Sequence, residues 1–190
     1  MEKPSKKPTV SKRKIELYQV RHEFGDGWAD ISLTFGEKSV NVMVSSDYGS
    51  FSHYWGHCGY NPKEFLTDIN FDYCMGKFFE SKKLYILDAE ACENEIKQSI
   101  ISLRKDGELT ADEAREAWDD LLNPEYGPQA GRDYYHRELY ESKHFERVFV
   151  DYESLPEKTK INPLCQEFWN NCWLPFIDVL KAEINTEQVI

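Results

Sequence analysis

Residues 45–79 read SSDYGSFSHYWGHCGYNPKEFLTDINFDYCMGKFF, and this stretch holds both a strand–turn–strand signal and the start of a helix. The turn is Ser46–Gly49, because Asp and Gly favour tight turns between two extended segments. The helix start has Asn61 as N-cap, Pro62 at the first helical position and Glu64 at the third. An apolar stripe at helical spacing follows: Phe65, Leu66, Ile69 and Tyr73. We therefore expect a helix that covers a sheet.

The segments around this stretch predict the sheet itself. Apolar residues alternate with polar ones at period two, and glycine-containing turns separate the segments. Short strands of this kind form antiparallel meanders with one face to be covered. The predicted strands are residues 14–24, 28–35, 39–46 and 50–57. The expected fold class is α+β, an antiparallel four-stranded meander covered by several helices.

Three further helices are indicated by their caps. Asp88 caps a helix over about residues 89–105, and Gly107 ends it. Thr110 and Glu113 form a capping box that opens a helix through Leu122. A final helix is expected over residues 162–183.

The apolar positions of these helices carry further expectations. Ala114, Trp118 and Leu121 are expected on the inner face of the 110–122 helix, and Pro175 should kink the final helix. Residues 123–131 are rich in Gly and Pro and predict a loop. Residues 132–152 are ambiguous, helical at 135–140 and extended at 148–150.

Size and charge predict one domain, over residues 14–190, after a disordered basic tail at residues 1–13. The chain has 190 residues and a net charge of -11. Residues 1–14 carry +5, so the other 176 carry -16. No apolar run approaches the length of a membrane span, and no apolar segment follows the basic N-terminus. Five cysteines without paired spacing are typical of reduced thiols, so we expect a cytoplasmic protein.

The candidates for catalysis are few. His53 and His57 would share one face of a strand, and Asp47 lies in the turn before it, so a metal-dependent enzyme is one alternative. A structural zinc site needs four ligands, and no second pair is present. Cys165 and Cys172 are expected to be buried thiols. We therefore expect no metal, no cofactor and no catalytic residues.

Acidic residues gather in the middle of the chain. Residues 88–120 contain eleven carboxylates against four Lys and Arg, a difference of -7. Carboxylates on a rigid helix could imitate a phosphate backbone and occupy a nucleic-acid-binding groove. An alternative is an ordinary solvated helix face. The residues expected to bind a partner are Asp112, Glu113, Glu116, Asp119 and Asp120.

The chain resembles a group of small proteins encoded by phages and prophages. Three motifs carry the resemblance: SSDYGSF (45–51), HYWGHCGYNPKEFL (53–66) and FDYCMGKFF (71–79). The resemblance implies a phage accessory setting, where small acidic proteins often block host defences such as CRISPR effector complexes.

The sequence thus favours an accessory protein that acts by binding in the bacterial host cell. Its expected partner is a basic host protein complex that handles nucleic acid. Direct binding to nucleic acid is not expected, because an acidic body repels it. Binding to a membrane is not expected either, because the chain has no apolar segment long enough to insert. A plain interaction module that uses its aromatic surface is a third alternative.

Overall fold

The computed structural model describes residues 8–187, apart from residue 26 and residues 123–131. These residues divide into two compact units. Unit 1 comprises residues 1–81 and 163–190, and unit 2 comprises residues 82–162. The expectation of one domain over residues 14–190 stays a prediction. Residues 1–7 of the predicted tail and the predicted loop at 123–131 lie outside the described residues, while residues 8–13 are exposed and belong to no helix or strand.

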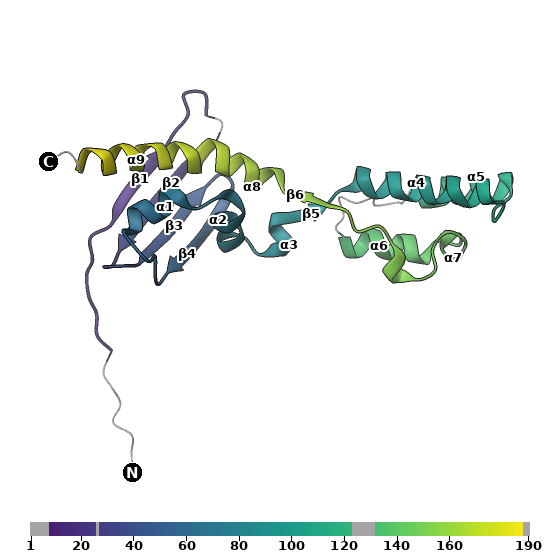
Figure 1. The fold of residues 1–190 in the computed structure, drawn as a ribbon, viewed down its shortest axis with the longest axis horizontal. Coiled ribbons are helices and arrows are strands. Elements are labelled where there is room, and N and C mark those ends of the chain that lie inside the picture. Colours follow the sequence, from purple (N-terminus) through teal and green to yellow (C-terminus); the bar gives the residue numbers. More distant parts are fainter. Residues whose placement is uncertain (1–7, 26, 123–131, 188–190) are drawn as a thin grey trace, which may run out of the picture. The chain divides into compact units, whose positions relative to one another are not determined.

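Unit 1 contains the expected four-stranded antiparallel sheet, in the order β1-β2-β3-β4 (Figure 1). The strands are β1 (Glu16–Val20), β2 (Ala29–Phe35), β3 (Val40–Ser46) and β4 (Gly49–Trp55). Together with the helices described below, this sheet confirms the α+β fold class.

One inner row of side chains crosses the whole sheet. Tyr18 pairs with Ile31, Ile31 with Val44, and Val44 with Phe51. Helices of unit 1 pack onto this row, because Tyr18 contacts Phe176 and Phe51 contacts Phe78, with ring centroids 5.1 and 5.0 Å apart. Burying one face of a sheet beneath helices removes its apolar side chains from water, which is the main stabilising term.

The helix predicted from Asn61 onward is interrupted. It forms α1 (Pro62–Asp68) and α2 (Phe71–Phe78), because Ile69 has an extended backbone and Asn70 caps the second helix through Tyr73 N at 2.9 Å. The N-cap role of Asn61 is confirmed, since its side chain accepts a hydrogen bond from Lys63 N at 2.9 Å.

The C-terminal helix of unit 1 is irregular where the sequence predicts a kink. Its parts are α8 (Pro163–Phe168), the π-helical segment η3 (Trp169–Trp173) and α9 (Leu174–Glu187). Pro175 has no N–H to donate to the carbonyl of Asn171, its partner in a regular α-helix. Nε2 of His22 lies 2.8 Å from that carbonyl oxygen instead.

Unit 2 is a helical unit with a small two-stranded sheet. Its longest helices, α4 (Ala89–Asp106) and α5 (Ala111–Leu121), agree with the predicted boundaries. The other elements are α3 (Ser81–Leu84, beginning at the unit boundary), β5 (Tyr85–Leu87), α6 (Arg132–Glu141), α7 (Phe145–Val148), the 3-10 turn η2 (Tyr152–Ser154) and β6 (Thr159–Ile161).

Two features of unit 2 differ from expectation. Strands β5 and β6 pair, with Ile86 opposite Lys160, although each has only three residues and no clear alternation. Residues 148–150, predicted as extended, do not form a strand. Short strands carry little sequence signal, so their pairing depends on the packing of the helices around them.

Candidate functional site

Helices α4 and α5 form a hairpin whose ends are fixed by local hydrogen bonds. Gly107 adopts a positive φ of 82° and ends α4. Thr110 Oγ1 then accepts a hydrogen bond from Glu113 N, while Thr110 N donates to Glu113 Oε2 at 2.9 Å. The inner faces of the two helices are held by buried apolar residues, Ile96, Ile100, Ala117 and Leu121. The outward side chains of α5 therefore stand on a stiff support.

The five predicted partner-binding residues form what we call the acid row: Asp112, Glu113, Glu116, Asp119 and Asp120. Asp112 and Glu116 lie one helical turn apart and are exposed, and 60% of the Glu116 side chain is accessible. Neither is paired with a lysine or arginine among the described residues. These two carboxylates are displayed to solvent as the sequence predicts, and Asp119 is exposed as well.

The other members of the acid row interact with groups of the chain itself. Glu113 completes the capping box, and its Oε1 lies 3.3 Å from Nη1 of Arg147. The hydrogen bonds from Thr110, with Arg147 nearby, lower the pKa of Glu113. Asp120 accepts a hydrogen bond from the Ser142 hydroxyl, and Asp119 also has an interaction partner.

A buried histidine lies beneath the acid row. Nε2 of His144 is 3.8 Å from Oε2 of Glu116, and His144 is only 3% exposed. Among the residues that the structure describes, neither of its ring nitrogens has a hydrogen-bond partner. A polar ring without partners is costly to bury, and the Glu116 carboxylate at 3.8 Å is a group that can stabilise it.

Trp118 departs from the sequence prediction. It was expected on the inner face of α5, yet it is 37% exposed and lines an open cavity of about 630 Å³ between α4 and α5. Ala117 takes the inner position at 0% exposure. Helical spacing alone could not separate these two neighbours, since both lie near the boundary of the apolar face. The adjacent charges Arg115 and Asp119 were the available signal for an exposed tryptophan.

The histidines proposed for a metal site are separated by the end of a strand. His53 lies on β4, and its ring packs 4.5 Å from that of Trp55. Burial, with Lys77 nearby, lowers the pKa of His53. Strand β4 ends at Trp55, so the shared-strand argument does not extend to His57. Within the described residues, no group of three or more His, Cys, Asp or Glu side chains could hold a metal ion.

The five cysteines are buried as free thiols. Burial raises the pKa of each, to about 11 for Cys172, where Asp47 adds to the effect. A higher pKa leaves less thiolate at neutral pH, which is the opposite of what a nucleophilic cysteine needs.

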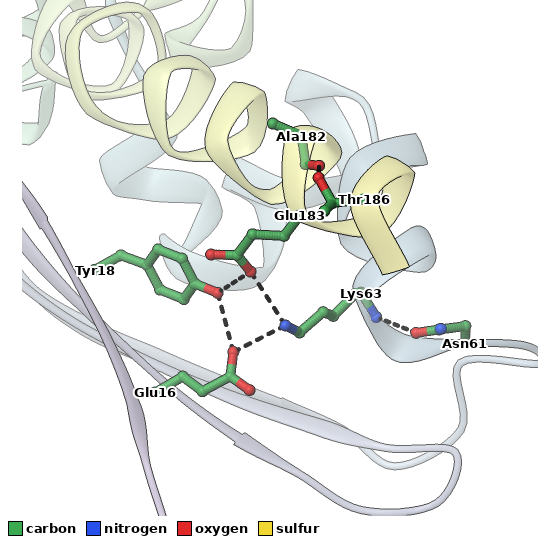
Figure 2. A network of polar contacts seen from close by, with 7 residues as sticks. All are labelled: Glu16, Tyr18, Asn61, Lys63, Ala182, Glu183 and Thr186. Carbon is green, nitrogen blue, oxygen red and sulfur yellow. Dashed lines mark hydrogen bonds and ion pairs between the residues drawn. The ribbon is translucent and has the colours of Figure 1, made fainter. Parts of the chain in front are cut away.

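Unit 1 contains a compact polar network that the sequence did not suggest (Figure 2). Nζ of Lys63 lies 3.1 Å from Oε2 of Glu16 and 3.2 Å from Oε2 of Glu183. The hydroxyl of Tyr18 lies 2.9 and 2.8 Å from the same two oxygens. Partial burial opposes the charge on Lys63, but the two carboxylates outweigh it and its pKa is raised. Because the four groups satisfy one another, we interpret the network as a clamp that joins β1, α1 and α9.

No helix among the described residues is long and apolar enough to cross a membrane. Taken together, the described residues define an α+β protein of two compact units, with exposed carboxylates on α5.

The chain matches the model of a phage protein family over residues 8–181, and it therefore belongs to this phage family. No curated protein and no solved structure matches the chain.

Proposed function

We propose that this phage accessory protein acts by binding, with the acid row of α5, a basic surface of a host protein complex that handles nucleic acid. Its effect would be inhibition of a host defence complex, such as a CRISPR effector, by occupying the groove meant for nucleic acid. The supporting observation is that Asp112 and Glu116 are exposed, one turn apart, and unpaired with lysine or arginine among the described residues.

Charge around the acid row supports attraction to cations. Unit 2 contains 19 carboxylates against 12 Lys and Arg, a net charge of -7 over residues 82–162. Helix α5 itself carries five carboxylates against Arg115. Such a field would steer encounters with a basic surface and would weaken as salt screens it.

Spacing sets how closely the acid row can imitate a nucleic acid. Successive carboxylates at four-residue spacing rise about 6 Å along a helix. A strand of DNA presents one phosphate per about 3.4 Å of axis. The acid row therefore corresponds to roughly every second phosphate of one strand, enough to compete for a groove whose cations lie along a line.

The test reverses the two displayed charges, and circular dichroism checks that the variant is folded, because Glu116 also lies 3.8 Å from the buried His144. Asp112→Lys with Glu116→Lys leaves the capping box and the Asp120–Ser142 hydrogen bond in place. Glu23→Lys with Glu37→Lys is the matched control, since both residues are exposed in unit 1 and both pairs change the net charge from -11 to -7. Tagged full-length variants would capture proteins from nuclease-treated bacterial lysate.

We expect the control to retain the captured complex and the α5 variant to lose it. The purified complex should then bind DNA or RNA less well as wild-type protein is added. Equal capture by both variants, or undiminished nucleic-acid binding by the complex, would contradict the proposal.

A further inference from the structure

The cavity between α4 and α5 has a size and lining suited to a small molecule. Its volume of about 630 Å³ is within the range of ligand pockets, which span roughly 300–1,000 Å³. The apolar part of its wall comes from both helices and is formed by Ile100, Ile101, Ala114 and Trp118.

Trp118 is the largest apolar group at this wall, and over a third of it remains accessible although the residue lies on a helix with a packed inner face. An accessible indole offers a flat surface on which another aromatic ring can stack. This favours a ligand with a planar apolar part.

Charged residues complete the lining, and they are mainly basic. Arg104, Lys105 and Arg115 contribute three cations, against the single carboxylate of Asp119. Lys105 and Arg115 make no hydrogen bond or ion pair with the described residues, although carboxylates are abundant in unit 2. Arg104 makes one long hydrogen bond, 3.4 Å, to the carbonyl of Leu109. Guanidinium groups that have no carboxylate partner and lie beside an apolar wall are suited to bind an anionic group.

We propose that this cavity binds a small organic anion that carries a planar aromatic part, with the ring on Trp118 and the anionic group at Arg104, Lys105 and Arg115. The lining has a net charge of +2, which suits an anion of one or two charges. A long polyanion is disfavoured because it would also meet the surrounding net charge of -7. Nucleoside monophosphates and aromatic sulfonates or carboxylates share the required chemistry.

The experiment monitors Trp118 directly. Full-length protein labelled with 5-fluorotryptophan gives fluorine resonances from five tryptophans, and Trp118→Phe identifies the one to follow. The probes are AMP and 1-naphthalenesulfonate, which separate a nucleotide from a general aromatic anion. Adenosine supplies the ring without the charge, and ribose 5-phosphate supplies the charge without the ring.

We expect AMP, naphthalenesulfonate or both to shift the Trp118 resonance and to saturate it below about 1 mM. Adenosine and ribose 5-phosphate should each bind about tenfold more weakly or worse, because each lacks one of the two interactions. Arg115→Gln and Lys105→Gln should each weaken binding by about fivefold or more. Lys143→Gln is the matched control, an exposed cation of unit 2 outside the cavity, and should leave binding unchanged.

Three results would overturn the inference: no saturable shift with either aromatic anion, equal affinity for adenosine and AMP, or unchanged affinity in both Arg115→Gln and Lys105→Gln. Circular dichroism shows whether the helices of a variant are still folded, because the other four tryptophans lie in unit 1. The Asp112→Lys, Glu116→Lys protein should keep ligand binding, so this site and the proposed partner-binding function can fail independently.

Discussion

The phenolic oxygen of Tyr18 lies 2.8 Å from Oε2 of Glu183, although 165 positions separate the two residues. Tyr18 comes from the first strand and Glu183 from the last helix, so this contact joins the beginning and end of unit 1. Lys63 lies against the same carboxylate oxygen and brings α1 into the clamp (Figure 2).

Replacing Lys63 with methionine should destabilise unit 1. The side chain is only 16% exposed, and its loss leaves the Glu16 and Glu183 carboxylates close together without a cation. We expect the free energy of unfolding to fall by about 1–3 kcal/mol, between the values typical of exposed and buried ion pairs. Urea unfolding followed by circular dichroism measures this change.

The control for this variant is Lys38→Met, at an exposed lysine, which should change stability little. Adding Glu183→Gln to Lys63→Met should recover part of the loss, because it removes one of the two repelling charges. A double variant less stable than Lys63→Met would argue against repulsion as the cause.

The clamp also predicts a pH dependence. Burial of Tyr18, with hydrogen bonds to Glu183 and Glu16, raises the pKa of its hydroxyl above the ordinary value near 10. A group with a raised pKa in the folded state contributes its full stability below the unfolded pKa and loses it as the pH rises further. We therefore expect the free energy of unfolding to fall between about pH 9 and pH 11.

Tyr18→Phe should make that fall shallower, as urea unfolding at several pH values would show. A residual slope is expected, because the pKa values of Tyr60, Tyr135 and Lys63 and of the five buried cysteines are also raised. Tyr54→Phe, at an exposed tyrosine, should keep the wild-type slope. Identical slopes for Tyr18→Phe and wild type would contradict the interpretation of the clamp.

His22 and Pro175 should be energetically coupled. The imidazole of His22 bonds to the Asn171 carbonyl, to which Pro175 cannot donate. His22→Ala should cost about 0.5–1 kcal/mol in the wild-type background and less in Pro175→Ala, where the alanine N–H can take over. A double-mutant cycle measured by urea unfolding gives the coupling, and strict additivity would show that the imidazole does not replace the missing donor.

In both units the sequence predicted the elements whose signal is local. The four strands of unit 1 were predictable because period-two alternation between glycine turns is a local pattern. The caps of α4 and α5, at Asp88, Gly107 and Thr110, were predictable for the same reason. The break at Ile69 was missed because the apolar stripe continues across it, and only the cap formed by Asn70 marks the new helix.

For the acid row, too, the sequence predicted one part of the arrangement and could not predict another. The sequence predicted that carboxylates would follow one side of α5, since helical spacing places them there. It could not assign separate roles to Glu113, Glu116 and Asp120, because Arg147, His144 and Ser142 reach them from another part of the chain.

Short-range patterns in the sequence determined the strands, the helix caps, the surplus of negative charge and the position of the carboxylates on α5. Only the tertiary structure decided which carboxylates remain displayed, that Trp118 opens into a cavity where Lys105 and Arg115 have no partner among the described residues, and that Glu16, Tyr18, Lys63 and Glu183 form a clamp. The physical reason is range: turns and caps depend on neighbours a few positions away, whereas ion pairs and cavities depend on segments that meet only after the chain has folded.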